Sequence, residues 1–153
     1  MTTVRFALPA LALLVAACSS GGGGTSPSTT SATPAPSGSV AATRIEVKLT
    51  DALRIEPAQM TVPAGVPVTF VVTNTGATDH EFYLGDEAAQ QAHAAEMASI
   101  GGMMHDEPEG IGVKPGATRE LVYTFPSAGP TLAGCHVAGH YAGGMKAEIT
   151  VTP

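Results

Sequence analysis

The chain has 153 residues, of which 13% are charged, and its 13 acidic side chains outnumber its 7 lysines and arginines. The resulting net charge of −6 argues against nucleic-acid binding, because such binding depends on neutralising phosphates with basic side chains. The acidic balance is compatible with attraction to a basic protein surface. The chain has two cysteines, no tryptophan and few aromatic residues, so we expect a modest hydrophobic core.

Residues 1–17 have the features of a secretory signal peptide. One early positive charge, Arg5, precedes an apolar run that is too short to cross a bilayer. The run ends directly before Cys18 in Val-Ala-Ala, which resembles the bacterial lipobox, where the cysteine is lipidated and becomes the first mature residue. We therefore expect lipid on Cys18 to anchor the protein to the outer face of the cell membrane, at the cell surface or on the periplasmic side. The alternative is an ordinary cleavage site with an incidental cysteine.

Residues 18–42 consist almost entirely of Gly, Ser, Thr, Pro and Ala. Such a stretch buries too little apolar surface to offset the entropy of ordering it, so it is predicted to be a flexible linker. Its mean span would be about 25 to 30 Å, enough to hold a small domain away from a lipid surface. A glycosylated stalk is the alternative. The remaining residues, 43–153, are sufficient for one domain.

Short strands and turns dominate the pattern of residues 43–153. Residues 44–49 alternate apolar and polar side chains, as a half-buried strand does. Further strands are predicted at residues 60–62, 66–74, 80–84, 119–125 and 146–151, with glycine and proline turns at residues 63–65, 113–116 and 127–130. This pattern predicts an all-β fold, an antiparallel Greek-key β-sandwich.

One segment departs from the strand pattern. Residues 86–99 are rich in alanine and Asp86 is well placed as an N-cap, so a short helix is predicted there. Gly101 and Gly102 should end this helix, and an acidic loop follows them. We expect the helix and loop to be an insertion between strands, not a separate domain.

A thiol, an imidazole and a thioether fall within one short loop, at Cys135, His140 and Met145, with four residues between successive members. Together with a second imidazole, they form the ligand set of a mononuclear blue-copper centre, in which the methionine is a weak axial ligand. His80 is the leading candidate for that second imidazole. If Cys18 carries lipid, Cys135 has no disulfide partner, and a lone thiol in an oxidising compartment is protected by burial or by metal. The alternatives are a small buried core cysteine and a site for zinc.

These residues resemble the pattern of the cupredoxins, the type 1 blue-copper family that includes plastocyanin, azurin and auracyanin. The resemblance rests on residues 74–82, on the ligand loop, and on the turns at residues 115–116 and 125–126. The spacing in the loop is similar to that of longer-loop members such as auracyanin and rusticyanin. The resemblance implies a cupredoxin-like copper-binding domain over residues 43–153, with one copper ion held by His80, Cys135, His140 and Met145.

Two residues beside these candidates are assigned no ligand role. His136 directly follows Cys135, and because neighbouring strand residues face opposite ways, its side chain should point away from the metal. A shift in register could exchange it with His140. Glu81 follows His80 and is expected to be solvated or to brace the loop.

The helical insertion contains a possible second metal site. His93 and Met97 are four residues apart on one helical face, and Met103, Met104 and His105 follow in the loop. One interpretation is that the methionines pack the helix over the sandwich while the histidines face solvent. The other is a softer site for Cu(I), since thioethers and imidazoles both suit that ion. This insertion resembles those of exported copper-tolerance cupredoxins.

The function predicted from these features is that of a membrane-tethered protein carrying single electrons between an exported redox donor and acceptor. We expect a monomer and no enzymatic activity, because one cysteine cannot form a dinuclear thiolate-bridged copper site and no further histidine cluster of the multicopper oxidase kind is present. One alternative is an extracytoplasmic copper-binding protein for copper tolerance or delivery, with more than one copper ion per chain. Another is a metal-free β-sandwich that acts as an adhesion or binding module.

Overall fold

The computed structural model describes residues 43–153, which form nine strands and one helix. The predicted signal peptide (1–17), the linker (18–42) and the lipidation site at Cys18 lie outside the described residues. In chain order the elements are β1 (Thr43–Thr50), β2 (Arg54–Glu56), β3 (Gln59–Pro63), β4 (Pro67–Asn74), β5 (His80–Gly85), α1 (Glu87–Ser99), β6 (Gly110–Val113), β7 (Thr118–Thr124), β8 (Gly129–Gly134) and β9 (Lys146–Thr152).

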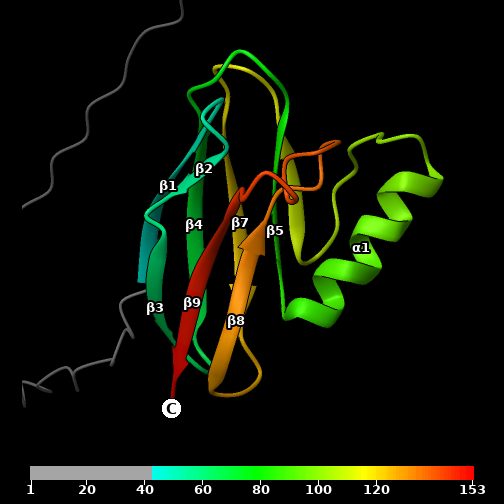
Figure 1. The fold of residues 1–153 in the computed structure, drawn as a ribbon. Coiled ribbons are helices and arrows are strands. Elements are labelled where there is room, and N and C mark those ends of the chain that lie inside the picture. Colours follow the sequence, from blue (N-terminus) through cyan, green and yellow to red (C-terminus); the bar gives the residue numbers. More distant parts are fainter. Residues whose placement is uncertain (1–42) are drawn as a thin grey trace, which may run out of the picture. The chain divides into compact units, whose positions relative to one another are not determined.

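The strands form two sheets packed face to face, and α1 lies outside them beside β5 and β8 (Figure 1). The four-stranded sheet has the order β2-β1-β4-β7, and the five-stranded sheet has the order β3-β9-β8-β5-β6. In β9, buried side chains alternate with exposed ones, which is why this segment forms a strand with one face toward the other sheet. The predicted β-sandwich is confirmed.

Two of the strand pairs are parallel: β1 with β4, and β3 with β9. The sheets are therefore mixed, whereas the sequence pattern predicted antiparallel pairing throughout. The chain crosses to the second sheet after β2 and returns after β3, so β4 comes to lie beside β1 in the same direction. Alternation of apolar and polar residues reports which face of a strand is buried and not which way its neighbour runs.

The space between the sheets is filled by aliphatic side chains around a small aromatic group. Phe70 of β4 packs against Phe82 of β5, with ring centroids 5.3 Å apart, and meets the edge of Phe125 at 6.3 Å. Phe70 and Phe82 are fully buried, and burying a side chain of this size stabilises a fold by about 1.5 to 3 kcal/mol. Cys135 and Met145 belong to this core, so the predicted ligand loop is anchored in the hydrophobic interior.

The helix begins and ends as the sequence predicted. The Asp86 side chain accepts a hydrogen bond from the Ala89 N–H at 2.9 Å, which satisfies one of the free donors of the first turn. At the other end the Gly102 N–H donates to the Met97 carbonyl at 2.7 Å, and both Gly101 and Gly102 have the positive φ that favours glycine. This helix, the only one among residues 43–153, is not long and apolar enough to span a membrane.

Candidate metal centre

The loop between β8 and β9 lies at one end of the sandwich (Figure 1), and Cys135 and Met145 are its first and last residues. The Cys135 N–H donates to the Met145 carbonyl at 3.2 Å, so the two residues continue the pairing of the strands that flank them. Between them the chain turns back on itself, and the Met145 N–H donates to the His140 carbonyl at 3.0 Å. Gly139 and Gly144 have φ values of 83° and 94°, which residues with side chains rarely adopt, so this tight turn requires glycine there.

His80 reaches the same place from the start of β5. This strand pairs with β8 in antiparallel register, so its first residues lie beside the end of β8 and the cysteine that follows. His80 Nδ1 lies 3.9 Å from the Cys135 Sγ and 3.2 Å from the His140 Nδ1. The His140 Nδ1 is 3.4 Å from the same sulfur. One nitrogen of each histidine and the sulfur therefore all lie within 4.8 Å of one another.

Polar contacts on the Nε2 side of the ring fix the orientation of His80. Its Nε2 lies 3.3 Å from a carboxylate oxygen of Asp51 and 3.4 Å from the Thr78 hydroxyl. A carboxylate only accepts hydrogen bonds, so Nε2 carries the ring proton and Nδ1 presents a lone pair to the cysteine and to His140. Asp51 also accepts hydrogen bonds from the Ala77 N–H and the Thr78 hydroxyl, both at 2.7 Å, and these hold the loop before β5 in place.

The electrostatics of this centre suit a bound cation. His80, Cys135 and Met145 are completely buried, and His140 is the partly exposed member. Burial raises the pKa of the Cys135 thiol to about 11. Burial and the neighbouring His80 lower the pKa of His140, which favours its neutral form. Two imidazole nitrogens 3.2 Å apart beside a thiol fit a soft or borderline metal ion, which would attract a lone pair from each ring and displace the thiol proton.

The structure thus brings together three of the four residues predicted to hold copper, His80, Cys135 and His140. Met145 lies in the same buried loop, and its role as an axial ligand stays a prediction. His136 points away from the three, as predicted. Its Nε2 donates to the Gln90 side-chain oxygen at 2.7 Å, and its ring stacks on Tyr141.

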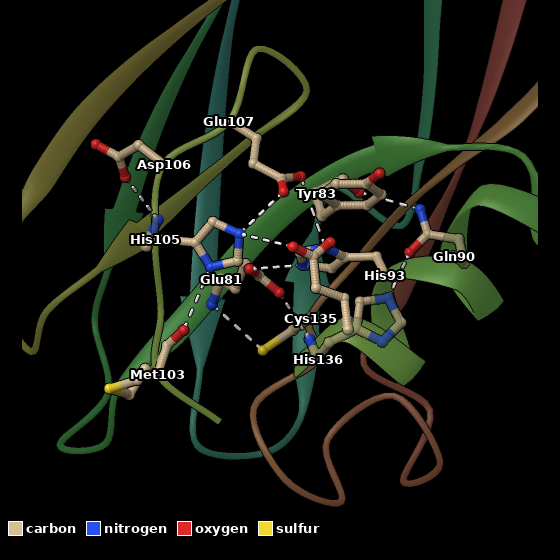
Figure 2. A network of polar contacts seen from close by, with 12 residues as sticks. Glu81, Tyr83, Gln90, His93, Met103, His105, Asp106, Glu107, Cys135 and His136 are labelled. Carbon is tan, nitrogen blue, oxygen red and sulfur yellow. Dashed lines mark hydrogen bonds and ion pairs between the residues drawn. The ribbon is translucent and has the colours of Figure 1, made fainter. Parts of the chain in front are cut away.

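Glu81 is buried, so of its two expected roles the solvated carboxylate is wrong and the bracing of the loop is confirmed. Its Oε2 accepts a hydrogen bond from the His136 N–H at 3.1 Å, and its Oε1 accepts one from the His93 Nε2 at 2.9 Å (Figure 2). The carboxylate therefore joins α1 to the residue that follows Cys135. The sequence signal that marked Glu81 was only its place beside His80.

The interpretation in which the insertion's histidines face solvent was also wrong for His93. Its side chain is 1% exposed, and its ring stacks on Tyr83 at a centroid distance of 3.8 Å with the planes 2° apart. Spacing on the helix places His93 on the same face as Gln90 and Met97, and all three are buried against the sandwich. In an alanine-rich helix the two faces differ little in polarity, so the sequence does not show which face packs against the sandwich.

The three methionines of the predicted Met/His site have different surroundings. Met97 is buried, Met103 is 68% exposed, and Met104 lies against Gly112 of β6. The polar neighbours of His93 and His105 are carboxylates instead: Glu81, Glu96 and Glu107.

The comparisons with known proteins agree with this architecture. The family model for the cupredoxin-like domain matches residues 10–100, more than half of the chain. The copper-resistant cuproprotein CopI of Rubrivivax gelatinosus is 38% identical over 107 residues, which cover 70% of this chain and 65% of that protein. CopI of Pseudomonas aeruginosa is 34% identical over 138 residues, which cover 71% of this chain and 76% of that protein.

Among solved structures, the dithionite-reduced auracyanin of Roseiflexus castenholzii superposes with a TM-score of 0.66 at 27% identity. The superposition covers 73% of this chain and 98% of the auracyanin chain. The family match, the CopI relatives and the His80, Cys135 and His140 cluster all point to the same metal. The chain belongs to the cupredoxin family, and it is a copper-binding cupredoxin.

Proposed function

We propose that this chain is an exported cupredoxin that protects the cell against copper by binding the ion at His80, Cys135, His140 and Met145. The observation that carries the proposal is the convergence of two imidazole nitrogens and a buried thiol within 4.8 Å. A soft thiolate combined with imidazoles favours copper over harder ions. The relatives at 34 to 38% identity are named copper-resistant cuproproteins, which supports a role in copper tolerance.

Each side chain of the centre has a separate task. The Cys135 thiol gives up its proton on binding, so uptake of the ion releases a proton and becomes tighter as pH rises. His80 presents a lone pair that Asp51 keeps in position, and His140 presents the second. The Met145 thioether, buried at the end of the same loop, would be the fourth ligand. Copper in such a site supplies a one-electron couple between Cu(II) and Cu(I).

The place of action in this proposal is outside the cytoplasm. The signal peptide in residues 1–17 would direct export, and lipid on Cys18 would hold the protein at the outer face of the cell membrane. The linker in residues 18–42 would let the copper domain move above that surface. Cys18→Ser tests the anchor directly: we expect the variant to move from the membrane fraction to the soluble fraction, and retention in the membrane fraction would contradict lipid attachment.

Transfer of single electrons between exported redox proteins is the second candidate function. It is supported by the likeness to auracyanin and by the exposure of His140, the one partly exposed member of the His80, Cys135 and His140 cluster. Ala138, Gly139, Ala142 and Gly143, small residues of the same loop, are exposed, which would let a basic redox partner approach His140 closely. In this role the protein would bind copper and carry electrons, and in copper tolerance it would bind copper. Neither role requires enzymatic activity.

A growth experiment separates the two roles. The gene is deleted, and the strain is complemented with the wild-type chain or with Cys135→Ser and grown over a range of copper concentrations. We expect deletion to lower the tolerated copper concentration and the wild-type chain alone to restore it. Equal rescue by Cys135→Ser would contradict the role of this site in tolerance. Normal copper tolerance combined with a respiratory defect would favour the electron carrier.

A further inference from the structure

A second group of metal-type ligands lies between α1 and the loop that leads to β6. His93 and Glu96 are one turn apart on the helix, and His105 and Glu107 come from the loop, with ring centroids of the two histidines 6.0 Å apart (Figure 2). His105 Nε2 lies 2.9 Å from Glu107 Oε1 and 3.5 Å from Glu96 Oε1. His93 Nδ1 lies 3.6 Å from Glu107 Oε2 and 3.9 Å from Glu96 Oε2. One ligand atom each of His93, Glu96 and Glu107 thus lies within 4.8 Å of the others, and His105 contacts both carboxylates.

One atom of this group has no partner. His93 Nδ1 is buried and makes no hydrogen bond, although its side chain is 1% exposed. The other ring nitrogen, Nε2, donates to Glu81, so a lone pair on Nδ1 is the part of the ring left to bind a cation. That lone pair points toward Glu96 and Glu107, whose carboxylates also only accept. Two carboxylates beside a buried ring nitrogen favour a cation between them, either a metal ion or a proton on Nδ1.

The negative charge of the side chains around His93 also favours a bound cation. Among residues 43–153, no lysine or arginine forms an ion pair with Glu81, Glu96 or Glu107. Arg119, on β7, donates to both carboxylate oxygens of Asp106 at 2.7 Å. The group therefore concentrates negative charge around buried imidazole without a fixed positive side chain.

The donors present identify the class of ion. We infer that His93, Glu96, His105 and Glu107 form a second metal site for a divalent transition-metal ion, with Cu(II) the preferred occupant. Two imidazoles and two carboxylates make a nitrogen and oxygen donor set, which suits Cu(II) and, less tightly, Zn(II). The set contains no thioether, so it differs from the Cu(I) site expected from the methionines and favours the oxidised ion.

The histidines of the chain support this assignment. All five lie in the described residues. His80 and His140 face Cys135, and His136 is bound to Gln90 and stacked on Tyr141. The remaining two, His93 and His105, are the pair in this second group. A second copper ion per chain would therefore have to bind them to gain two imidazole ligands.

The two groups are joined by a short path. His93 Nε2 donates to the Glu81 side chain at 2.9 Å, and the Glu81 backbone N–H donates to the Cys135 Sγ at 3.3 Å. An ion on His93 Nδ1 would polarise the ring and strengthen its hydrogen bond to Glu81. We expect the electronic spectrum of copper at Cys135 to shift when the second site fills, a consequence that rests on the copper centre proposed above.

Titration of the metal-free full chain with Cu(II), followed by calorimetry and spin resonance, tests the second site. The wild-type chain should bind two ions, one of them with the visible thiolate band and the other with nitrogen and oxygen ligands and no such band. His105→Gln/Glu107→Gln should bind the second ion about 100-fold more weakly and keep the thiolate band of the first. Glu120→Gln is the matched control, because Glu120 is an exposed carboxylate on β7 that pairs only with Arg44, and it should bind two ions.

The result that would overturn the second site is equal copper stoichiometry and affinity in the wild-type chain and in His105→Gln/Glu107→Gln. A wild-type chain that binds only one ion would overturn it as well. Thermal unfolding of the metal-free variants shows whether the double substitution folds. If it does not, Glu96→Gln, at a half-exposed position, gives the same test, with a weaker second ion expected and unchanged binding contradicting the site.

Discussion

The backbone N–H of Glu81 donates a hydrogen bond to the Sγ of Cys135 at 3.3 Å. The Glu81 side chain accepts hydrogen bonds from the His93 Nε2–H and from the backbone N–H of His136. One residue of β5 thus supports the sulfur of the copper centre with its backbone and connects the helical insertion to the ligand loop with its carboxylate. A hydrogen bond to the thiolate also favours its charged form.

Replacing Glu81 by alanine should therefore destabilise the metal-free protein strongly. The change leaves the buried His93 Nε2 and the His136 N–H without acceptors, and we expect the free energy of unfolding to fall by about 2 to 5 kcal/mol. Chemical denaturation measures this loss. Glu120→Ala removes an exposed carboxylate whose surface ion pair with Arg44 should contribute less than about 1 kcal/mol. Similar small losses in both variants would show that the buried carboxylate does not hold the helix to the loop.

Met145→Leu tests the axial thioether. Met145 is fully buried in the core, and leucine has a similar volume, so the free energy of unfolding should change by less than about 1.5 kcal/mol. Copper should still bind, because three ligands remain, and its reduction potential should rise, because loss of the sulfur donor weakens support for Cu(II). Direct electrochemistry of the copper-loaded variant measures the potential. An unchanged potential would mean that Met145 is not a ligand.

The pH dependence of stability should report the role of Asp51. Hydrogen bonds from the Ala77 N–H and from Thr78 lower the pKa of Asp51 to about 2, below its ordinary value of 3.8. A folded-state pKa below the unfolded one means that the carboxylate stabilises the fold above pH 3.8, and that this stabilisation is lost as pH falls toward 2.

Asp51→Asn in the metal-free protein is the corresponding test. We expect it to lower the melting temperature at pH 7, and the difference from the wild-type chain should shrink between about pH 4 and pH 2. Asp79→Asn provides a control, since Asp79 is bonded only to an exposed lysine, Lys114. A difference between Asp51→Asn and the wild-type chain that stays constant down to pH 2 would contradict the role of the charged carboxylate.

The parts of the fold that were predictable from sequence depend on local patterns. The cap at Asp86, the glycines after α1 and the alternation in β9 each act within a few residues, so the sequence shows them directly. The ligand loop was predictable for the same reason, because Cys135, His140 and Met145 lie close together in the chain and needed only a distant His80. That long-range pairing came from the resemblance to a family, and the structure confirms that His80, Cys135 and His140 meet.

Features that depend on strand register and helix docking were not predictable. β8 contains Gly129 and Pro130, which are typical of turns, and yet it is a central strand because it pairs with both β5 and β9. The burial of Glu81 and His93 follows from α1 lying against β5, a contact between elements that no local pattern encodes. The same docking places the carboxylates of Glu96 and Glu107 near His93.

Absorption spectroscopy of the Cu(II)-loaded full chain shows whether copper binds through the sulfur of Cys135. We expect an intense visible band from thiolate-to-copper charge transfer in the wild-type chain and its complete loss in Cys135→Ser, which keeps nearly the same shape. Copper bound by the wild-type chain without such a band, or a band of equal intensity in Cys135→Ser, would contradict the account.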